Sequence, residues 1–117
     1  MWNAESILSF IHKRLDAVEQ NGQGQNEEET QMLRSAKNGE LFALADLSLR
    51  LEPGDNPYSM LAKLREARER APQELDGDDI ASFQFVQVCL EVSGLVRNYL
   101  DEIEMNISTQ VSINPLL

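Results

Sequence analysis

The chain has 117 residues, of which 42% are hydrophobic and 26% charged, and its 20 acidic against 10 Lys and Arg residues give a formal net charge of −10. This length predicts a single domain that can bury a hydrophobic core without metal or disulfide support. An acidic surface repels nucleic-acid backbones and anionic membranes, whose binding requires Lys and Arg to displace counterions. Direct binding of nucleic acid or of a membrane is therefore not expected.

Cysteine usage and the N-terminal residues indicate a cytoplasmic location. The single cysteine, Cys89, cannot form an internal disulfide, and residues 1–5 lack the basic and apolar regions of a secretory signal. The longest uncharged apolar stretch, residues 80–90, is shorter than the roughly 18 residues that suggest a membrane span. We expect no transmembrane segment.

The first half of the chain predicts three helices. Apolar residues recur at helical spacing across residues 3–20, and the two glycines of residues 21–25 indicate a flexible loop. Asn26 followed by three glutamates is typical of a helix start, and this helix is expected to end at Gly39. Residues 41–51 are apolar enough for a mostly buried helix that ends before Pro53.

The second half predicts two more helices. Asn56 as a cap and Pro57 at the first helical position begin a helix that runs to residue 71, and residues 73–79 form an exposed acidic loop. From residue 79 to about 105, a helix about 40 Å long is apolar on nearly all sides. Its apolar residues form two stripes, the first made of Ile80, Phe83, Val86 and Leu90 and the second of Phe85, Val88, Val92, Leu95, Tyr99 and Ile103.

Together these elements predict an all-α protein, a compact bundle of four to five helices around a long, largely buried C-terminal helix. Residues 83–92 are also rich in β-branched and aromatic residues, so an α+β fold with a strand there is the alternative. A single helical domain is expected over residues 1–105. Residues 106–117 are uncharged and alternate as a strand does, which predicts a C-terminal tail that is frayed or pairs with a partner's sheet edge.

No combination of side chains indicates catalysis, a cofactor or a metal ion. Proton transfer and nucleophilic attack need at least two positioned groups, and the chain offers one histidine, His12, and one cysteine. His12 lies one turn before Asp16 on a polar helix face, and the apolar neighbours of Cys89 favour a buried, inert thiol. The acids of residues 74–79 do not follow the calcium-loop pattern. We expect a protein that is not an enzyme.

Charge is unevenly distributed along the chain. Residues 58–71 contain four basic and two acidic residues, a net charge of +2, whereas residues 72–105 contain eight acidic residues and one basic residue, a net charge of −7. Pairs one turn apart, Arg65 with Glu69 and Glu66 with Arg70, are one interpretation of the basic segment. The other is that opposite patches steer a partner or a second copy into register.

These observations favour protein binding. We expect a small acidic adaptor, chaperone or inhibitor that occupies a surface of a protein partner, and a homodimer is another way to cover the excess of apolar surface. The expected contact residues are five apolar side chains and the acids that flank them, namely Leu41, Phe42, Leu49, Phe85 and Tyr99, with Glu27, Glu28, Glu29, Asp76, Asp78 and Asp79.

A nucleic-acid mimic is the alternative function. In this hypothesis acidic side chains imitate phosphates and block a DNA- or RNA-binding protein, as phage-encoded inhibitors of host defence do. The basic segment at residues 58–71 argues against it. The acids concerned are Glu27, Glu28, Glu29, Glu74, Asp76, Asp78, Asp79, Asp101, Glu102 and Glu104.

Overall fold

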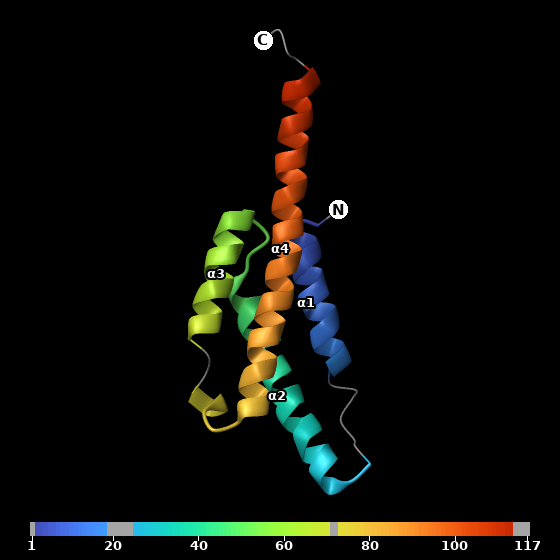
Figure 1. Ribbon diagram of the computed structural model, residues 1–117, viewed down its shortest axis with the longest axis vertical. Coiled ribbons are helices and arrows are strands. Elements are labelled where there is room, and N and C mark those ends of the chain that lie inside the picture. Colours follow the sequence, from blue (N-terminus) through green and yellow to red (C-terminus); the bar gives the residue numbers. More distant parts are fainter. Residues whose placement is uncertain (1, 19–24, 71–72, 114–117) are drawn as a thin grey trace.

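The computed structural model is an all-α bundle (Figure 1). It describes residues 2–18, 25–70 and 73–113. The helices are α1 (Ala4–Val18), α2 (Glu27–Arg50), α3 (Pro57–Glu69) and α4 (Asp79–Ile113), with a short 3₁₀ turn, η1 (Gln73–Leu75), before α4. The alternative strand at residues 83–92 is wrong, because α4 runs through this segment without interruption. The predicted loop at residues 21–25 lies, apart from Gln25, outside the described residues.

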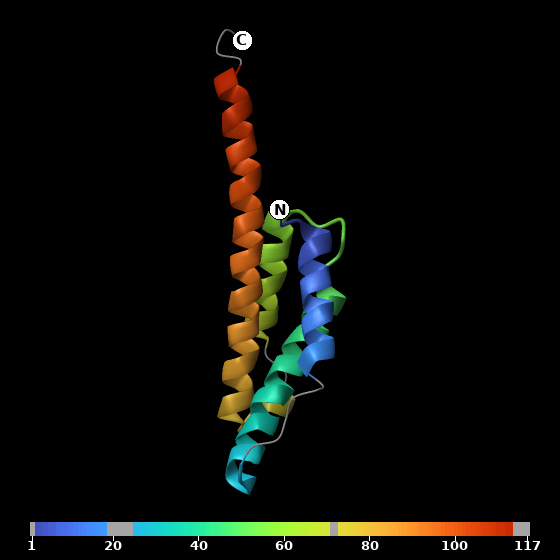
Figure 2. The ribbon, with the colours of Figure 1, turned by 90° about the vertical axis from the view of Figure 1, so that its right-hand side faces the viewer.

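The long C-terminal helix packs against the other helices, as expected. In Figure 1, α4 crosses in front of α2. Helix α3 lies to the left of α4, and α1 lies to its right. The main contacts of α4 are with α2 and α3, whereas α1 packs mainly against α2. Figure 2 shows that α4 forms one edge of the bundle and that its last turns extend past the other helices.

The core is built from one apolar stripe of each helix. On α4 the buried stripe contains Phe85, Val88 and Val92, which belong to the second of the two stripes predicted for this helix. This spacing of three and four residues keeps side chains on one helix face. The largest fully buried side chains are Ile7, Ile11, Leu44, Leu47, Met60, Leu64, Phe85, Val88, Cys89, Val92 and Val96.

Two helix starts confirm the caps predicted from the sequence. The side chain of Asn26 accepts a hydrogen bond from the Glu29 N–H at 2.7 Å, and Asn56 accepts one from the Ser59 N–H at 2.8 Å. Pro57 occupies the first turn of α3, where its missing N–H has no intrahelical partner to lose. These caps fix the points at which α2 and α3 begin.

Gly39 does not end a helix, contrary to the prediction. It is a buried residue within α2, which continues as one helix of 24 residues to Arg50. A Cβ added at Gly39 would lie 2.0 Å from the carbonyl oxygen of Ala81 and 2.8 Å from its Cα. Glycine is therefore required here because α2 and α4 approach each other with their backbones almost in contact.

The C-terminal segment also differs from the prediction. Instead of ending near residue 105, α4 remains helical to Ile113, so the alternation in residues 106–113 does not mark a strand. Residues 114–117 lie outside the described residues. Because α4 is continuous, it places residues 106–113, which carry no charge, on a helix that projects from the bundle (Figure 1).

The segment Asp79–Met105 of α4 is also long and apolar enough to cross a membrane, judged by length and composition alone. The most apolar 18-residue window of this segment has a mean hydropathy of 1.3, and 33% of the residues in that window are buried in the bundle. The core helix of a water-soluble bundle meets the same criterion, and the inner stripe of this helix packs against α2 and α3.

Candidate protein-binding surfaces

The first candidate surface is a stripe of exposed apolar residues on α2. Phe42, Ala45 and Leu49 follow one another at spacings of three and four residues, so they lie on one face of the helix. The exposed fraction is 39% for Phe42 and 85% for Leu49, and Ala45 is also exposed. We call these three residues the α2 stripe.

The second candidate surface is a similar stripe on α4. Phe83 is 59% exposed and Leu90 is 43% exposed, and Val86 between them is half-buried. Phe83 and Leu90 are seven residues apart, as are Phe42 and Leu49 on α2. We call Phe83, Val86 and Leu90 the α4 stripe. It belongs to the first of the two stripes that the sequence predicts for this helix.

The two stripes face away from each other. Each lies opposite the buried side of its own helix, and α2 and α4 pack against each other through those buried sides. Because α2 and α4 occupy different faces of the bundle (Figure 2), one binding partner on α2 leaves α4 free for another. The arrangement therefore provides two separate apolar surfaces.

The structure divides the apolar residues that were expected to contact a partner. Phe42 and Leu49 are exposed, whereas Leu41 and Tyr99 are half-buried and pack against the core. Phe85 is fully buried between the helices, so its assignment to a contact surface is corrected to a core position. The sequence reasoning missed Phe83, two residues earlier, because α4 is apolar on nearly all sides in this region and its register is set by packing.

The predicted acidic residues fall into separate groups. Glu27, Glu28 and Glu29 are exposed in the first turn of α2. Asp76 and Asp79 are exposed around the start of α4, whereas Asp78 lies at the cap position and accepts a hydrogen bond from the Ala81 N–H at 3.0 Å. Asp78 therefore has a structural role at this helix start.

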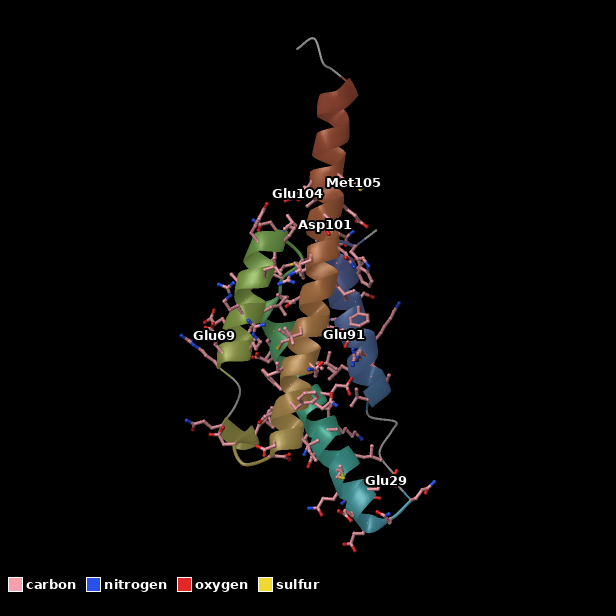
Figure 3. All side chains as sticks on the ribbon, in the orientation of Figure 1. Glu29, Glu69, Glu91, Asp101, Glu104 and Met105 are labelled. Atoms are coloured by element: carbon pink, nitrogen blue, oxygen red, sulfur yellow. The ribbon has the colours of Figure 1, made fainter. Side chains whose placement is uncertain are left out.

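Three further acids of the mimic hypothesis, Asp101, Glu102 and Glu104, lie on α4 toward the other end of the molecule, and the side chain of Glu74 lies outside the described residues. Figure 3 shows Glu29 near one end and Asp101 and Glu104 toward the other. Glu102 is half-buried and accepts a hydrogen bond from the Trp2 N–H at 3.2 Å, which ties the start of α1 to α4. The acidic groups are thus divided between distant parts of the bundle.

Arg14 connects three helices in a way that the sequence analysis did not foresee. From α1 it bonds Glu40 of α2 at 2.7 Å and also Glu91 of α4. The hydrogen bonds that Arg14 donates to Glu91 and to Glu40 raise the pKa of Arg14, against the opposing effect of its burial. Arg14 is therefore a fixed structural cation rather than a free contact residue.

Of the two ion pairs predicted within the basic segment, one is formed. Arg70 lies 3.3 Å from Glu66, while among the described ion pairs none joins Arg65 to Glu69. Glu66 also lies 3.9 Å from Arg50 of α2. Charges of α3 thus serve partly to hold the bundle together.

The histidine and the cysteine of the chain lie in different surroundings. His12 is exposed on α1, where it lines a shallow groove with Glu5, Asp16 and Pro53. Among the described residues, no three His, Cys, Asp or Glu side chains are arranged to hold a metal ion. Cys89 is free and buried, as expected, and burial, with a smaller effect from Asp46, raises the pKa of its thiol to about 11.

The raised pKa of Cys89 predicts a loss of stability at alkaline pH. The thiol of the unfolded chain titrates near pH 9.0 and that of the folded chain near pH 11, so deprotonation between these values favours unfolding. We expect the free energy of unfolding to fall by about 2–3 kcal/mol more in the native chain than in Cys89→Ala over this range. Urea unfolding from pH 7 to 11 measures this difference. Parallel pH profiles for the two proteins would contradict the prediction.

Comparisons with known proteins give no information on the role of the two stripes. No protein-family model, no curated protein and no solved structure matches the chain.

Proposed function

We propose that this chain is a non-enzymatic protein-binding module, an adaptor, chaperone or inhibitor that occupies a surface of a protein partner through the α2 stripe. The observation that carries the proposal is the exposure of Leu49, 85% in a helix whose other face supplies the core. Phe42 and Ala45 continue the same surface. Large contiguous apolar patches are uncommon on a monomer and mark binding sites.

The charge of the chain defines the chemistry of the partner. The α2 stripe lies on the same helix as the three exposed glutamates, Glu27, Glu28 and Glu29, in a chain of net charge −10. These glutamates lie about 20–33 Å from the stripe along the helix, at about 1.5 Å per residue, so they act at long range by steering partners of opposite charge, which adds mainly to the association rate. We therefore expect a partner of net positive charge with an apolar groove, into which α2 inserts Phe42 and Leu49 as anchors.

The nucleic-acid mimic has weaker support. A mimic needs acids spaced along one surface, and the acids here lie in groups near different ends of the bundle (Figure 3). Exposed cations, Arg65 and Arg68 on α3 and Arg97 on α4, occur in the helices between them. We keep the mimic as an outcome of the experiment below.

Replacing the two anchors tests the proposal. In Phe42→Ser/Leu49→Ser, we expect the recovery of the partner from host lysate to fall at least about tenfold, because truncation of buried anchors costs more than 1.4 kcal/mol. The fold should be unchanged, since both side chains are exposed. Quantitative mass spectrometry of proteins bound to the tagged chain, after washes at low and high salt, provides the measurement.

Two control variants define the alternatives. Tyr58→Ser removes another exposed aromatic residue, on α3, and should leave binding unchanged. Glu27→Gln/Glu28→Gln/Glu29→Gln should slow association but leave a complex that survives high salt. If binding instead disappears at high salt and with the glutamine variant, while the serine variant still binds, the partner is held by charge and the mimic replaces the adaptor.

A further inference from the structure

The α4 stripe lies on a face of the bundle that no other described element covers. Figure 2 shows α4 at one edge of the molecule, with the other helices on one side of it only. Asp79, Gly94 and Arg97 are exposed and lie on the same face of α4 as the stripe. A Cβ added at Gly94 would meet nothing within 4 Å, so the helix surface is open at this position.

The residues on this face complement one another across a two-fold axis. We propose that the α4 stripe binds a second copy of this chain, with the two α4 helices antiparallel and Phe83 of each copy packed over Gly94 of the other. The axis then passes between residues 88 and 89 and places Gln87 opposite Leu90. Glycine allows the close approach that a large aromatic ring needs, and an isologous interface forms each contact twice.

The same axis pairs opposite charges. It brings Arg97 of one copy beside Asp79 of the other, one residue out of register, at both ends of the contact. Neither residue takes part in an ion pair within the part of the chain that the structure describes. A parallel pair would set Arg97 against Arg97 and Phe83 against Phe83, so size and charge both favour the antiparallel arrangement.

The α4 stripe and the α2 stripe lie on different faces of the bundle. The proposed dimer and the proposed binding of a protein partner can therefore be disproved separately. Sedimentation equilibrium of the full chain should give twice the monomer mass of 13.2 kDa, with a dimer dissociation constant that rises at least about tenfold in Phe83→Glu. In Phe42→Ser/Leu49→Ser the dimer should persist, because the α2 stripe faces away from the contact. The proposal is overturned if the native chain is still a monomer at about 100 μM, which corresponds to a binding free energy weaker than about 5.5 kcal/mol, or if the dimer is lost in Phe42→Ser/Leu49→Ser instead.

Charge exchange gives the sharper test. Asp79→Arg alone places like charges at both ends of the contact, and so does Arg97→Asp alone, so each variant should dimerise about tenfold more weakly. In a mixture of the two variants, both ends again pair an arginine with an aspartate, and the mixture should recover the native affinity as a heterodimer. Circular dichroism of each variant establishes that it is folded. Dimerisation that is not recovered on mixing overturns the antiparallel register.

Discussion

Replacing Gly39 by alanine is expected to destabilise the fold by about 2–3 kcal/mol, because the added methyl group cannot be accommodated between α2 and α4. The nearest atoms are backbone atoms of Ala81, with the carbonyl oxygen 2.0 Å from the new Cβ. A side chain could move to relieve such a contact, but here a whole helix must shift. Within an exposed helix the same change would stabilise by about 0.5–1 kcal/mol, so the packing effect reverses the sign of the intrinsic preference.

Gly94→Ala is the matched control for this prediction. Gly94 is also within a helix, and its added Cβ would meet nothing within 4 Å, so we expect the stability of the monomer to rise by about 0.5–1 kcal/mol. Urea unfolding followed by circular dichroism, at low protein concentration so that self-association does not contribute, measures both variants. Equal effects at the two positions would contradict a close approach at Gly39.

The role of Gly39 shows where the sequence is insufficient. Glycine after an amphipathic segment is a common helix stop, and this pattern predicts an end at Gly39. A glycine that permits close packing of two helices leaves the same local pattern, and only the position of Ala81, in a helix far along the chain, distinguishes the two. Helix starts were predicted correctly at Asn26 and Asn56, because capping depends on residues within one turn.

The end of α4 was missed for a related reason. Alternation of apolar and polar residues in 106–113 is typical of a strand, but the described part of the chain offers this segment no partner strand, and the segment continues an existing helix. Adding a residue to a formed helix costs far less than nucleating a new element. Apolar–polar alternation over a few residues therefore does not distinguish a strand from the continuation of a long preceding helix.

The candidate surfaces were predictable in part. Phe42 and Leu49 were expected at a contact surface, and the structure exposes both, although their role in binding stays a prediction. Phe85 was expected there as well and is buried. The sequence contained both apolar stripes of α4, but a helix that is apolar on nearly all sides does not reveal which stripe the other helices will cover.

A comparison of Phe85 with Phe83 tests this division most directly. Phe85 is fully buried between the helices, so Phe85→Ala should destabilise the fold by about 3–5 kcal/mol through lost burial and the cavity that remains. Phe83 is 59% exposed, and Phe83→Ala in the monomer should cost less than about 1 kcal/mol. Urea unfolding at low protein concentration measures both changes in the free energy of unfolding.

The contrast between these two phenylalanines also determines how binding experiments must be interpreted. Since small domains are stable by only about 5–15 kcal/mol, the loss at Phe85 takes a large part of the total, and weaker binding by Phe85→Ala would report the lower stability of the chain rather than a lost contact. Phe83→Ala leaves the bundle intact, so a loss of dimerisation there reports the surface itself. If the two substitutions instead destabilise the monomer equally, α4 is rotated relative to the core, and the assignment of its outer stripe is wrong.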